Sequence, residues 1–381
     1  MPVSVVISAV MASLIGFGGT LAVVLAAATA VGASPAEASS WVAASCLAVA
    51  ATSAFLSIRH RMPIVTAWST SGAALIAGFG AGIGMDRAVG AFIVAGLLVV
   101  ACAAVKPLGA LVARIPVAVA AAMLAGVLFH FVTALAEHAV ASPAVALPVI
   151  VAYFAMRLLA PKWAVPAALA AGTIDALALG RVGAMPAPEL SALAFVMPSF
   201  DTQVMLGLGV PLFLVTMASQ NLPGIAVLRA SGYAPPVRSI LAATGIASVV
   251  SAPFCTHTTN AAAITAALCT GPDTHPDPAE RWKTGMPYAV MYLLLAAAGT
   301  SLVAVFAALP PALIASVAGL ALISPLAGAL TAAVAQDRDR VAAVVAFATT
   351  ASGISALGLG APLWGLAAGL TVIGLDAIRQ R

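Results

Sequence analysis

The sequence predicts an all-α polytopic membrane protein with about fourteen membrane-spanning segments. Hydrophobic residues make up 63% of the 381 residues and charged residues only 7%, and the mean hydropathy is +1.13. A soluble domain carries roughly 25% charged residues because its surface faces water, so lipid must be the main solvent of this chain. The apolar runs are long and rich in Ala, Leu and Val, which favours helices over the short alternating strands of a membrane barrel.

The fourteen predicted segments are delimited by polar or Pro- and Gly-rich breaks. They cover residues 4–30, 36–58, 63–82, 87–105, 113–135, 142–159, 163–180, 203–228, 237–253, 254–270, 284–309, 311–334, 339–357 and 361–379. A straight helix needs ~20 residues to cross the hydrocarbon core. The third and tenth segments are short or broken, so we do not expect them to be helical from end to end. The first segment is interpreted as a membrane helix and not as a removable signal, because no charged residues precede it.

The distribution of basic residues supports an even number of spans with both termini in the cytoplasm. With that orientation, 14 of the 16 Lys and Arg residues fall on the cytoplasmic side, and only Arg87 and Arg181 fall on the other. Cytoplasmic loops carry such an excess of basic residues. A single misplaced span would reverse the alternation beyond it and remove the bias.

The two halves of the chain show a weak internal repeat. Gly32-Ala33-Ser34-Pro35 follows the first span, and Gly232-Tyr233-Ala234-Pro235 follows the eighth, at an offset of 200 residues. The octets Pro63–Thr70 and Pro253–Asn260 correspond at an offset of 190. Seven spans in each half is an odd number, so the second half enters the membrane from the opposite side. The sequence therefore predicts a seven-plus-seven inverted repeat, a plan common among secondary transporters.

The two octets are expected to form the binding site. Each has β-branched and hydroxyl residues after a Pro, followed by an Ala-rich helix, which predicts a short extended strand that leads into a half-helix at membrane depth. The N-terminus of such a half-helix presents free N–H groups and a partial positive charge, and both favour an anion. Ser69, Thr70, Thr259 and Asn260 are predicted to lie at the two helix starts, where each can cap the helix or bind the substrate.

Two adjacent amides, Gln220 and Asn221, interrupt the apolar eighth span beside Pro223-Gly224. Polar groups at this depth are costly unless they are paired, and hydrogen bonds between helices are one explanation for them. A substrate role is favoured because the first span has Gly18-Gly19-Thr20 at the aligned position, where small residues allow a ligand or backbone to approach.

Three ionisable residues are predicted to lie within the membrane: His130, Asp175 and His257. Such residues are candidates for function. His257 lies in the second octet and is the candidate for proton coupling, because a histidine changes charge near neutral pH; a neutral, hydrogen-bonded histidine is the open alternative. His130 is interpreted as structural, and Asp175 as one member of an ion pair with Arg181 at a helix end.

Several classes of function are disfavoured by the residues themselves. The four cysteines show no CxxC spacing and no His cluster, so no metal site, disulfide framework or cofactor is predicted. The basic residues are scattered singly, which does not indicate nucleic-acid binding. No HExxH or GxSxG motif and no paired intramembrane carboxylates occur, so the chain is not expected to be an enzyme. The runs Gly271–Trp282 and Gln336–Arg340 are interpreted as a rigid cytoplasmic connector and a solvated loop.

Several segments, in order along nearly the whole chain, resemble one known family. They are Gly32–Glu37, Val65–Thr70, Val215–Gly224, Asn260–Ala267 and the run Gly271–Trp282, of which Met217-Ala218-Ser219-Gln220-Asn221-Leu222-Pro223-Gly224 is the most specific. These segments are similar to the benzoate:proton symporter family (BenE type). Its architecture is similar to that of the nucleobase–ascorbate and sulfate-type anion transporters.

The resemblance implies two domains that are each built from both repeats. Residues 1–106 and 201–309 would form the core domain, and residues 107–200 and 310–381 the gate domain. It also implies location in the inner membrane of a bacterium. By analogy, the chain would form a homodimer through the gate domain. Nucleobase members of the superfamily have acidic residues on spans eight and ten, where this chain has Gln220 and Asn260; a carboxylate there would repel an anionic substrate.

The expected function is proton-coupled uptake of benzoate or a related aromatic carboxylate by alternating access. The carboxylate would bind at the two half-helix starts with help from Gln220, and the ring would lie against apolar groups. The expected substrate-binding residues are Gln220, Asn221, Ser69, Thr70, Trp68, Thr66, Thr259, Asn260, His257, Phe17 and Gly19, with Met217 and Phe254 as further ring contacts. Another small organic anion or a nucleobase-like solute on the same fold, and an anion channel, remain the alternatives.

Overall fold

The computed structural model describes residues 1–105, 116–184, 187–354, 356 and 359–379. Within these ranges, eight helices are long and apolar enough to cross a membrane, or nine if one bent pair counts as a single span. Three shorter apolar helices accompany them. The protein is thus a helical membrane protein with many spans, as predicted, while the number fourteen stays a prediction.

The first half of the chain forms helices interrupted by one short strand. Their bounds are α1 (Val3–Gly18), α2 (Leu21–Ala30), α3 (Pro35–His60), β1 (Thr66–Trp68), α4 (Thr70–Phe79), α5 (Met85–Ala104), α7 (Val117–Ala141), α8 (Pro143–Leu159), the 3-10 turn η1 (Pro161–Trp163) and α9 (Ala164–Ala178). The predicted first span is broken between α1 and α2, at Gly19 and Thr20. The start of the predicted span 113–135 lies partly outside the described residues.

The second half repeats the strand and the half-helix. It contains α10 (Thr202–Val204), the π-helical turn η2 (Met205–Gly209), α11 (Val210–Thr216), the π-helical turn η3 (Met217–Asn221), α12 (Leu222–Ala230), α13 (Val237–Ser251), η4 (Ala252–Phe254), β2 (Thr259–Ala261), α14 (Ile264–Thr270), η5 (Pro278–Thr284), α15 (Gly285–Ala297), α16 (Gly299–Ala308), α17 (Pro311–Ala333), η6 (Asp337–Asp339), α18 (Arg340–Ala351) and α19 (Ala361–Arg379). The predicted eleventh span is bent by 59° between α15 and α16.

The ends of α2 and α12 share one local structure, which supports the repeat. Gly32 and Gly232 have φ angles of 76° and 86°, a left-handed conformation that a glycine adopts at little cost. The N–H of the residue after each glycine donates to a carbonyl in the last helical turn: Ala33 to Ala28, and Tyr233 to Leu228. This is the glycine-terminated cap common at helix C-termini, and it occurs at the offset of 200 residues noted in the sequence.

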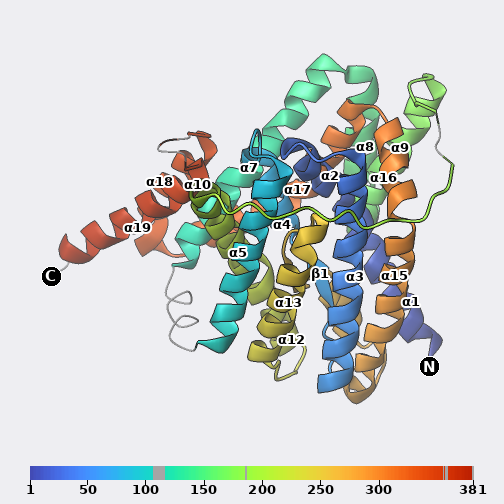
Figure 1. The fold of residues 1–381 in the computed structure, drawn as a ribbon, viewed down its shortest axis with the longest axis horizontal. Helices are drawn as coiled ribbons and strands as arrows, with labels where there is room; N and C mark the ends of the chain where they lie inside the picture. The colour runs from blue at the N-terminus through green and yellow to red at the C-terminus, as the bar shows by residue number, and fades with distance from the viewer. Residues whose placement is uncertain (106–115, 185–186, 355, 357–358, 380–381) are drawn as a thin grey trace.

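The two strands pair antiparallel near the middle of the bundle, where Figure 1 shows β1 beside α3. Thr66 lies opposite Ala261, Ala67 opposite Asn260, and Trp68 opposite Thr259. Each strand leads into a short helix, α4 or α14, as predicted. The predicted register of the second octet is wrong, however, because Thr259 and Asn260 lie in β2 and α14 begins only at Ile264. A 3-10 turn at η4 and a left-handed residue at Cys255 take up the additional residues.

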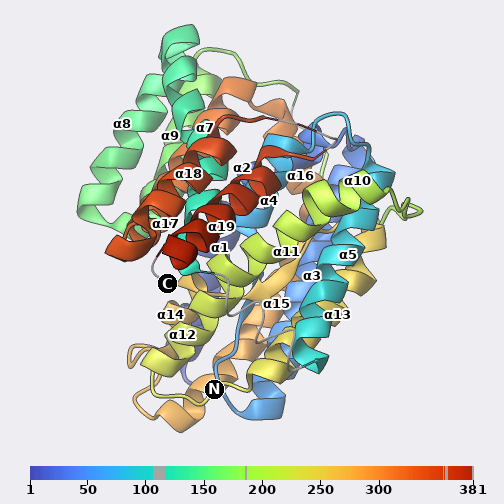
Figure 2. The same ribbon diagram turned by 90° about the vertical axis from the view of Figure 1, so that its left-hand side faces the viewer.

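The helices pack in two groups. In one group, α7 packs against α17, α18 and α19, while α8 and α9 pack against each other and against α17. In the other, α3 packs against α15 and α16, α5 against α13, α2 against α4, and α1 against α14 and α15. Figure 2 shows the first group on the left and the helices α3, α5, α13 and α15 on the right. The β1–β2 pair lies in the second group, and α4 contacts α7 of the first.

An extended connector, residues 187–200, joins α9 to α10 and runs across the outside of the second group (Figure 1). It is held by specific hydrogen bonds. The Ala194 N–H donates to the Ser40 hydroxyl at 2.9 Å, and the Val196 N–H donates to the Pro253 carbonyl at 2.8 Å. Its path is therefore fixed by α3 and by the turn that precedes β2.

Candidate functional site: the crossing of the two repeats

The two repeats meet where β1 pairs with β2, next to the start of α4 and the turn η3, and this region is called the crossing. The start of α4 is its best-defined helix N-terminus. Ser69 is the N-cap, and its hydroxyl accepts a hydrogen bond from the Gly72 N–H at 3.0 Å. The Thr216 hydroxyl on α11 donates to the same oxygen at 3.2 Å. The first-turn amides of Thr70 and Ser71 have no partner within the helix, so they provide donors at the positive end of its dipole. Ser69 and Thr70 thus lie at the helix start, as the sequence predicted.

Gln220 and Asn221 lie side by side in the π-helical turn η3 but make different contacts. The half-buried Gln220 donates from Nε2 to the Ser71 hydroxyl at 3.3 Å, which connects it to the first turn of α4. Asn221 is fully buried, and its Oδ1 accepts the Ala261 N–H at 2.9 Å. Asn221 therefore ties η3 to β2, whereas Gln220 lies beside the free amides. A π-helical turn within an α-helix often marks a functional site.

Aromatic side chains line the crossing on the side of α1 and α15. The Phe17 and Trp68 rings lie 5.4 Å apart, and Tyr292 meets Trp68 edge-on at 6.5 Å. The Trp68 indole N–H donates to the Thr20 hydroxyl at the break between α1 and α2. The close approach predicted at the two glycines is not seen, because a Cβ on Gly18 would meet nothing within 4 Å and one on Gly19 would meet only the Ile15 carbonyl oxygen of its own helix.

Phe254, a predicted ring contact, lies elsewhere. Its ring packs against Phe195 of the connector at 6.0 Å.

His257 is buried and both of its ring nitrogens are engaged. The Trp41 indole N–H donates to Nδ1 at 2.9 Å, and Nε2 lies 2.9 Å from the Ser69 carbonyl. Since an indole only donates and a carbonyl only accepts, the ring must be neutral with its proton on Nε2. A proton on Nδ1 would break the bond to Trp41. These contacts favour the neutral, hydrogen-bonded reading of His257 over the proton-coupling reading.

Thr66, Thr259 and Asn260 lie in the paired strands and are fully or almost fully buried. The Thr66 hydroxyl is hydrogen bonded to Thr52 and Ser53 on α3, at 2.7 and 2.8 Å. The Thr259 N–H donates to Ser248 on α13 at 2.9 Å. Their contacts fix the strands to the neighbouring helices. Asn260 differs, because its Oδ1 is buried and has no hydrogen-bond partner among the described residues.

Some residues at the crossing were not singled out from the sequence. Ser71 contacts Gln220, and Thr216 contacts Ser69. The Tyr288 hydroxyl donates to the Thr66 carbonyl at 3.0 Å. Ser71 directly follows Ser69-Thr70, so a longer hydroxyl run was a usable signal. Tyr288 lies in a predicted span whose sequence gives no indication of a binding site, so only the three-dimensional packing reveals it.

The other ionisable candidates lie on the first group of helices. His130 is exposed on α7, close to Gly353. Asp175 on α9 has a buried Oδ2 that finds no hydrogen-bond partner among the residues that the structure describes. The predicted ion pair of Asp175 with Arg181 is wrong, because the ion pairs of the described chain are Lys283–Glu280, Arg338–Asp339 and Arg340–Asp337.

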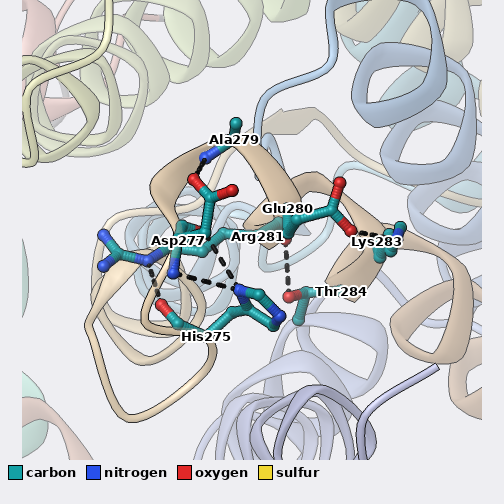
Figure 3. A network of polar contacts seen from close by, with 7 residues as sticks. All are labelled: His275, Asp277, Ala279, Glu280, Arg281, Lys283 and Thr284. Carbon is teal, nitrogen blue, oxygen red and sulfur yellow. Dashed lines mark hydrogen bonds and ion pairs between the residues drawn. The ribbon is translucent and has the colours of Figure 1, made fainter.

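The segment Gly271–Trp282, which follows α14, is held by a buried arginine (Figure 3). Arg281 donates from Nε to the His275 carbonyl at 2.8 Å and from a terminal nitrogen to the Thr270 carbonyl at 2.7 Å. Thr270 is the last residue of α14, so this cation satisfies the C-terminal end of the half-helix. Outside the membrane helices, Tyr233 donates to the Pro278 carbonyl, and burial raises the pKa of its hydroxyl.

Two cavities occur away from the crossing. One of about 740 Å³ lies beneath the connector, between it and α3 and α16. The other, of about 380 Å³, lies between the ends of α5 and α13 beside Arg238. No group of His, Cys, Asp or Glu that could hold a metal ion is found in the described part of the chain.

Comparison with known proteins identifies the family. Residues 1–375 match the family described as "Benzoate membrane transport protein" (BenE). The chain belongs to this family. It is 38% identical over 384 residues to the inner membrane protein YdcO of Escherichia coli (strain K12), covering 100% of this chain and 98% of that protein. It is 33% identical over 368 residues to the benzoate membrane transport protein of Acinetobacter baylyi, covering 96% and 93%.

A solved structure shows the same fold. The transmembrane domain of the cyanobacterial bicarbonate transporter BicA matches with a TM-score of 0.62 at 15% identity, covering 97% of this chain and 98% of that one. The predicted inverted-repeat architecture is thus confirmed. The BenE-family chain is a membrane transport protein and not an enzyme.

Proposed function

We propose that the chain carries benzoate or a related aromatic carboxylate, together with a proton, by alternating access. Membership of the BenE family supports this, as does the printed name of the Acinetobacter baylyi relative. The structural observation that carries the proposal is the start of α4, where first-turn amides without a partner in the helix lie beside Gln220 and close to an aromatic pair.

The substrate carboxyl group would accept hydrogen bonds from the amides of Thr70 and Ser71 and from Gln220. A helix N-terminus stabilises a negative or partly negative group by its N–H donors and its dipole. The ring would lie against Phe17 and Trp68, whose faces bury apolar area. Partial charges hold such a group without a fixed cation, which favours release on the other side of the membrane.

The two groups of helices are the natural moving parts. We propose that the group containing β1 and β2, residues 1–106 and 201–309, is the core domain and that residues 107–200 and 310–381 form the gate domain. Motion of one against the other would expose the crossing to each side in turn. A homodimer formed through the gate domain is expected, and the mass of the purified protein in detergent tests it.

We propose that both termini lie in the cytoplasm of a bacterial inner membrane. The basic ends of α3 and α13 meet the segment Gly271–Trp282 at one end of the bundle. There Arg61 lies 4.3 Å from the centre of the Trp282 ring and His60 contacts Ser239. A membrane-impermeant thiol reagent added to intact cells should label Ala187→Cys and not Ala234→Cys; the opposite pattern would contradict this orientation.

A direct test of the binding site is Gln220→Ala, with Gln203→Ala as the control. Both glutamines lie in the same predicted span, but Gln203 is exposed at its end. Gln220→Ala should weaken transport of labelled benzoate by about tenfold or more, the effect of losing one hydrogen bond to a charged or partly charged group. Wild-type kinetics in Gln220→Ala would refute the site assignment.

Other solutes on the same fold are the alternative, and the name of the BicA neighbour, a bicarbonate transporter, gives a reason to test one. Competition of labelled benzoate uptake by bicarbonate, aliphatic acids and nucleobases would identify a better substrate. An anion channel would not show counterflow from preloaded vesicles, because exchange requires a carrier.

A further inference from the structure

The crossing contains no basic side chain in the part of the chain that the structure describes. All the basic residues of the described chain lie at helix ends and in loops: Arg59, Arg61, Arg87, Arg157, Lys162, Arg181, Arg229, Arg238, Arg281, Lys283, Arg338, Arg340 and Arg379. Arg281 is the buried exception, and its guanidinium is committed to the carbonyls of Thr270, His275 and Pro276. A buried carboxylate at the crossing would therefore be balanced by helix N–H groups alone, and an uncompensated buried charge is expensive.

The titratable side chains of the crossing are poor proton carriers. His257 is held neutral between the Trp41 N–H and the Ser69 carbonyl. The carboxyl groups and the second histidine of the surrounding helices α3 and α5, which are Glu37, Asp86 and His60, lie at helix ends. The titratable groups away from those ends are the thiols of Cys46, Cys255 and Cys269 and the hydroxyls of Tyr288 and Tyr292, all buried. These groups are uncharged at neutral pH unless an activating cation lies nearby. A carboxylate that could exchange a proton is absent from the described crossing.

Asn260 supplies a hydrogen-bond acceptor that has no partner. Its side chain is fully buried, and its Nδ2 donates to the Ala261 carbonyl at 2.9 Å. Oδ1 is left without a donor among the described residues. Exchanging the two amide atoms would place Oδ1 against the Ala261 carbonyl oxygen, so the assigned orientation is the favourable one. An unpaired buried acceptor loses its hydration without a replacement, and a ligand that brings a donor would recover that energy.

We propose that the proton is carried by the substrate itself, so that the site takes an undissociated aromatic carboxylic acid. This inference rests on the proposed function. A carboxylic acid has one O–H donor and one C=O acceptor. The O–H would donate to Asn260 Oδ1, and the C=O would accept from the α4 amides and Gln220. One carboxylate and one proton combine on the entry side, cross as the neutral acid, and separate again on the other side, so no net charge moves.

Equilibrium binding in detergent tests this, because neutral aromatic acids also cross lipid bilayers unaided and would obscure an uptake assay. The ligands are para-substituted benzoates whose pKa values differ by about one unit, and benzenesulfonate, which stays anionic. At one pH above these pKa values, the dissociation constant for total ligand should fall about tenfold for each unit of increase in ligand pKa. Benzenesulfonate should not compete. The inference is overturned if benzenesulfonate competes as well as benzoate, or if affinity is independent of ligand pKa.

Variants locate the proton independently. His257→Gln replaces both hydrogen bonds without a titratable group, and Asp175→Asn removes the buried carboxyl of α9. Both should keep the tenfold loss of benzoate affinity per pH unit, and loss of that slope in either variant would move the proton to the protein. Asn260→Ala should weaken benzoate binding by tenfold or more; if it does not fold, the ligand series on the wild type still decides. Wild-type protein that binds no benzoate would refute the proposed function itself, whereas binding with the wrong ligand dependence would refute only this inference.

Discussion

The bridge from Trp41 through His257 to Ser69 should matter more for stability than for proton coupling. His257→Leu removes the acceptor of the Trp41 indole N–H and the donor to the Ser69 carbonyl, both buried contacts of 2.9 Å. Leucine fills a similar volume, so the main effect is to leave the buried Trp41 N–H without a partner, while the Ser69 carbonyl keeps the Ala73 N–H at 2.8 Å. The unpaired N–H costs about 1–3 kcal/mol and the lost hydrogen bond to Ser69 about 0.5–1.5 kcal/mol more, which gives about 2–4 kcal/mol in total.

His257→Gln is the matched control for this substitution. Its amide oxygen can accept from Trp41 and its amide nitrogen can donate to Ser69, so it should recover most of the lost free energy of unfolding. The assay is thermal unfolding of the purified protein in detergent, followed by the fluorescence of buried tryptophans. We expect a clear fall in melting temperature for His257→Leu and a small one for His257→Gln. Equal melting temperatures for wild type and His257→Leu would refute the reasoning, as would a Gln variant no more stable than the Leu variant.

The buried Arg281 and the packing of α12 give two further predictions. Arg281→Gln should lower the melting temperature markedly, because three backbone carbonyls lose their donor. Lys283→Gln is the control, since it breaks only a half-exposed ion pair with Glu280 and should cost about 0–1 kcal/mol. Comparable losses of stability in the two variants would contradict the role of Arg281. Gly224→Ala would place a Cβ 2.7 Å from the Ala262 carbonyl oxygen and should cost about 1–3 kcal/mol by overpacking. Gly328→Ala meets nothing within 4 Å and should be neutral, so equal stability of the two alanine variants in detergent unfolding would show that α12 does not need this close approach to β2.

The general fold could be predicted from the sequence because lipid restricts the choices. Long apolar runs, the excess of basic residues on alternate loops and a repeated Gly-x-x-Pro segment each have a direct physical cause in the bilayer. The octet after Pro63 was placed correctly, since Ser69 is a good N-cap residue and directly precedes α4.

The second octet was misplaced because similar residue types do not fix the start of a helix. Thr256, Thr258, Thr259 and Asn260 were read as the equivalents of Thr66–Thr70, but η4 and the left-handed Cys255 delay the strand by three residues. No hydrophobic periodicity marks this delay, because residues 256–262 are buried throughout. The cap residue of α14 is Ala263, which gives no capping signal at all.

The partners of His257 were also beyond the sequence. Trp41 lies 216 residues away on α3, and nothing local distinguishes a histidine that accepts from an indole from one that exchanges protons. Asp175 was expected to pair with Arg181 because both lie near the end of the seventh predicted span. The chain turns away from the helix at Gly180, which has a φ of 62°, and the two residues form no ion pair.

Uptake of radiolabelled benzoate into proteoliposomes, with and without an inward proton gradient, tests the central claim most directly. Protein-free liposomes and liposomes with Gln220→Ala measure the passive and site-independent components. We predict that the wild type accumulates benzoate faster than both controls, that the gradient increases this difference, and that preloaded unlabelled benzoate drives counterflow without any gradient. Uptake equal to that of protein-free liposomes under every condition, in folded protein, would contradict the account.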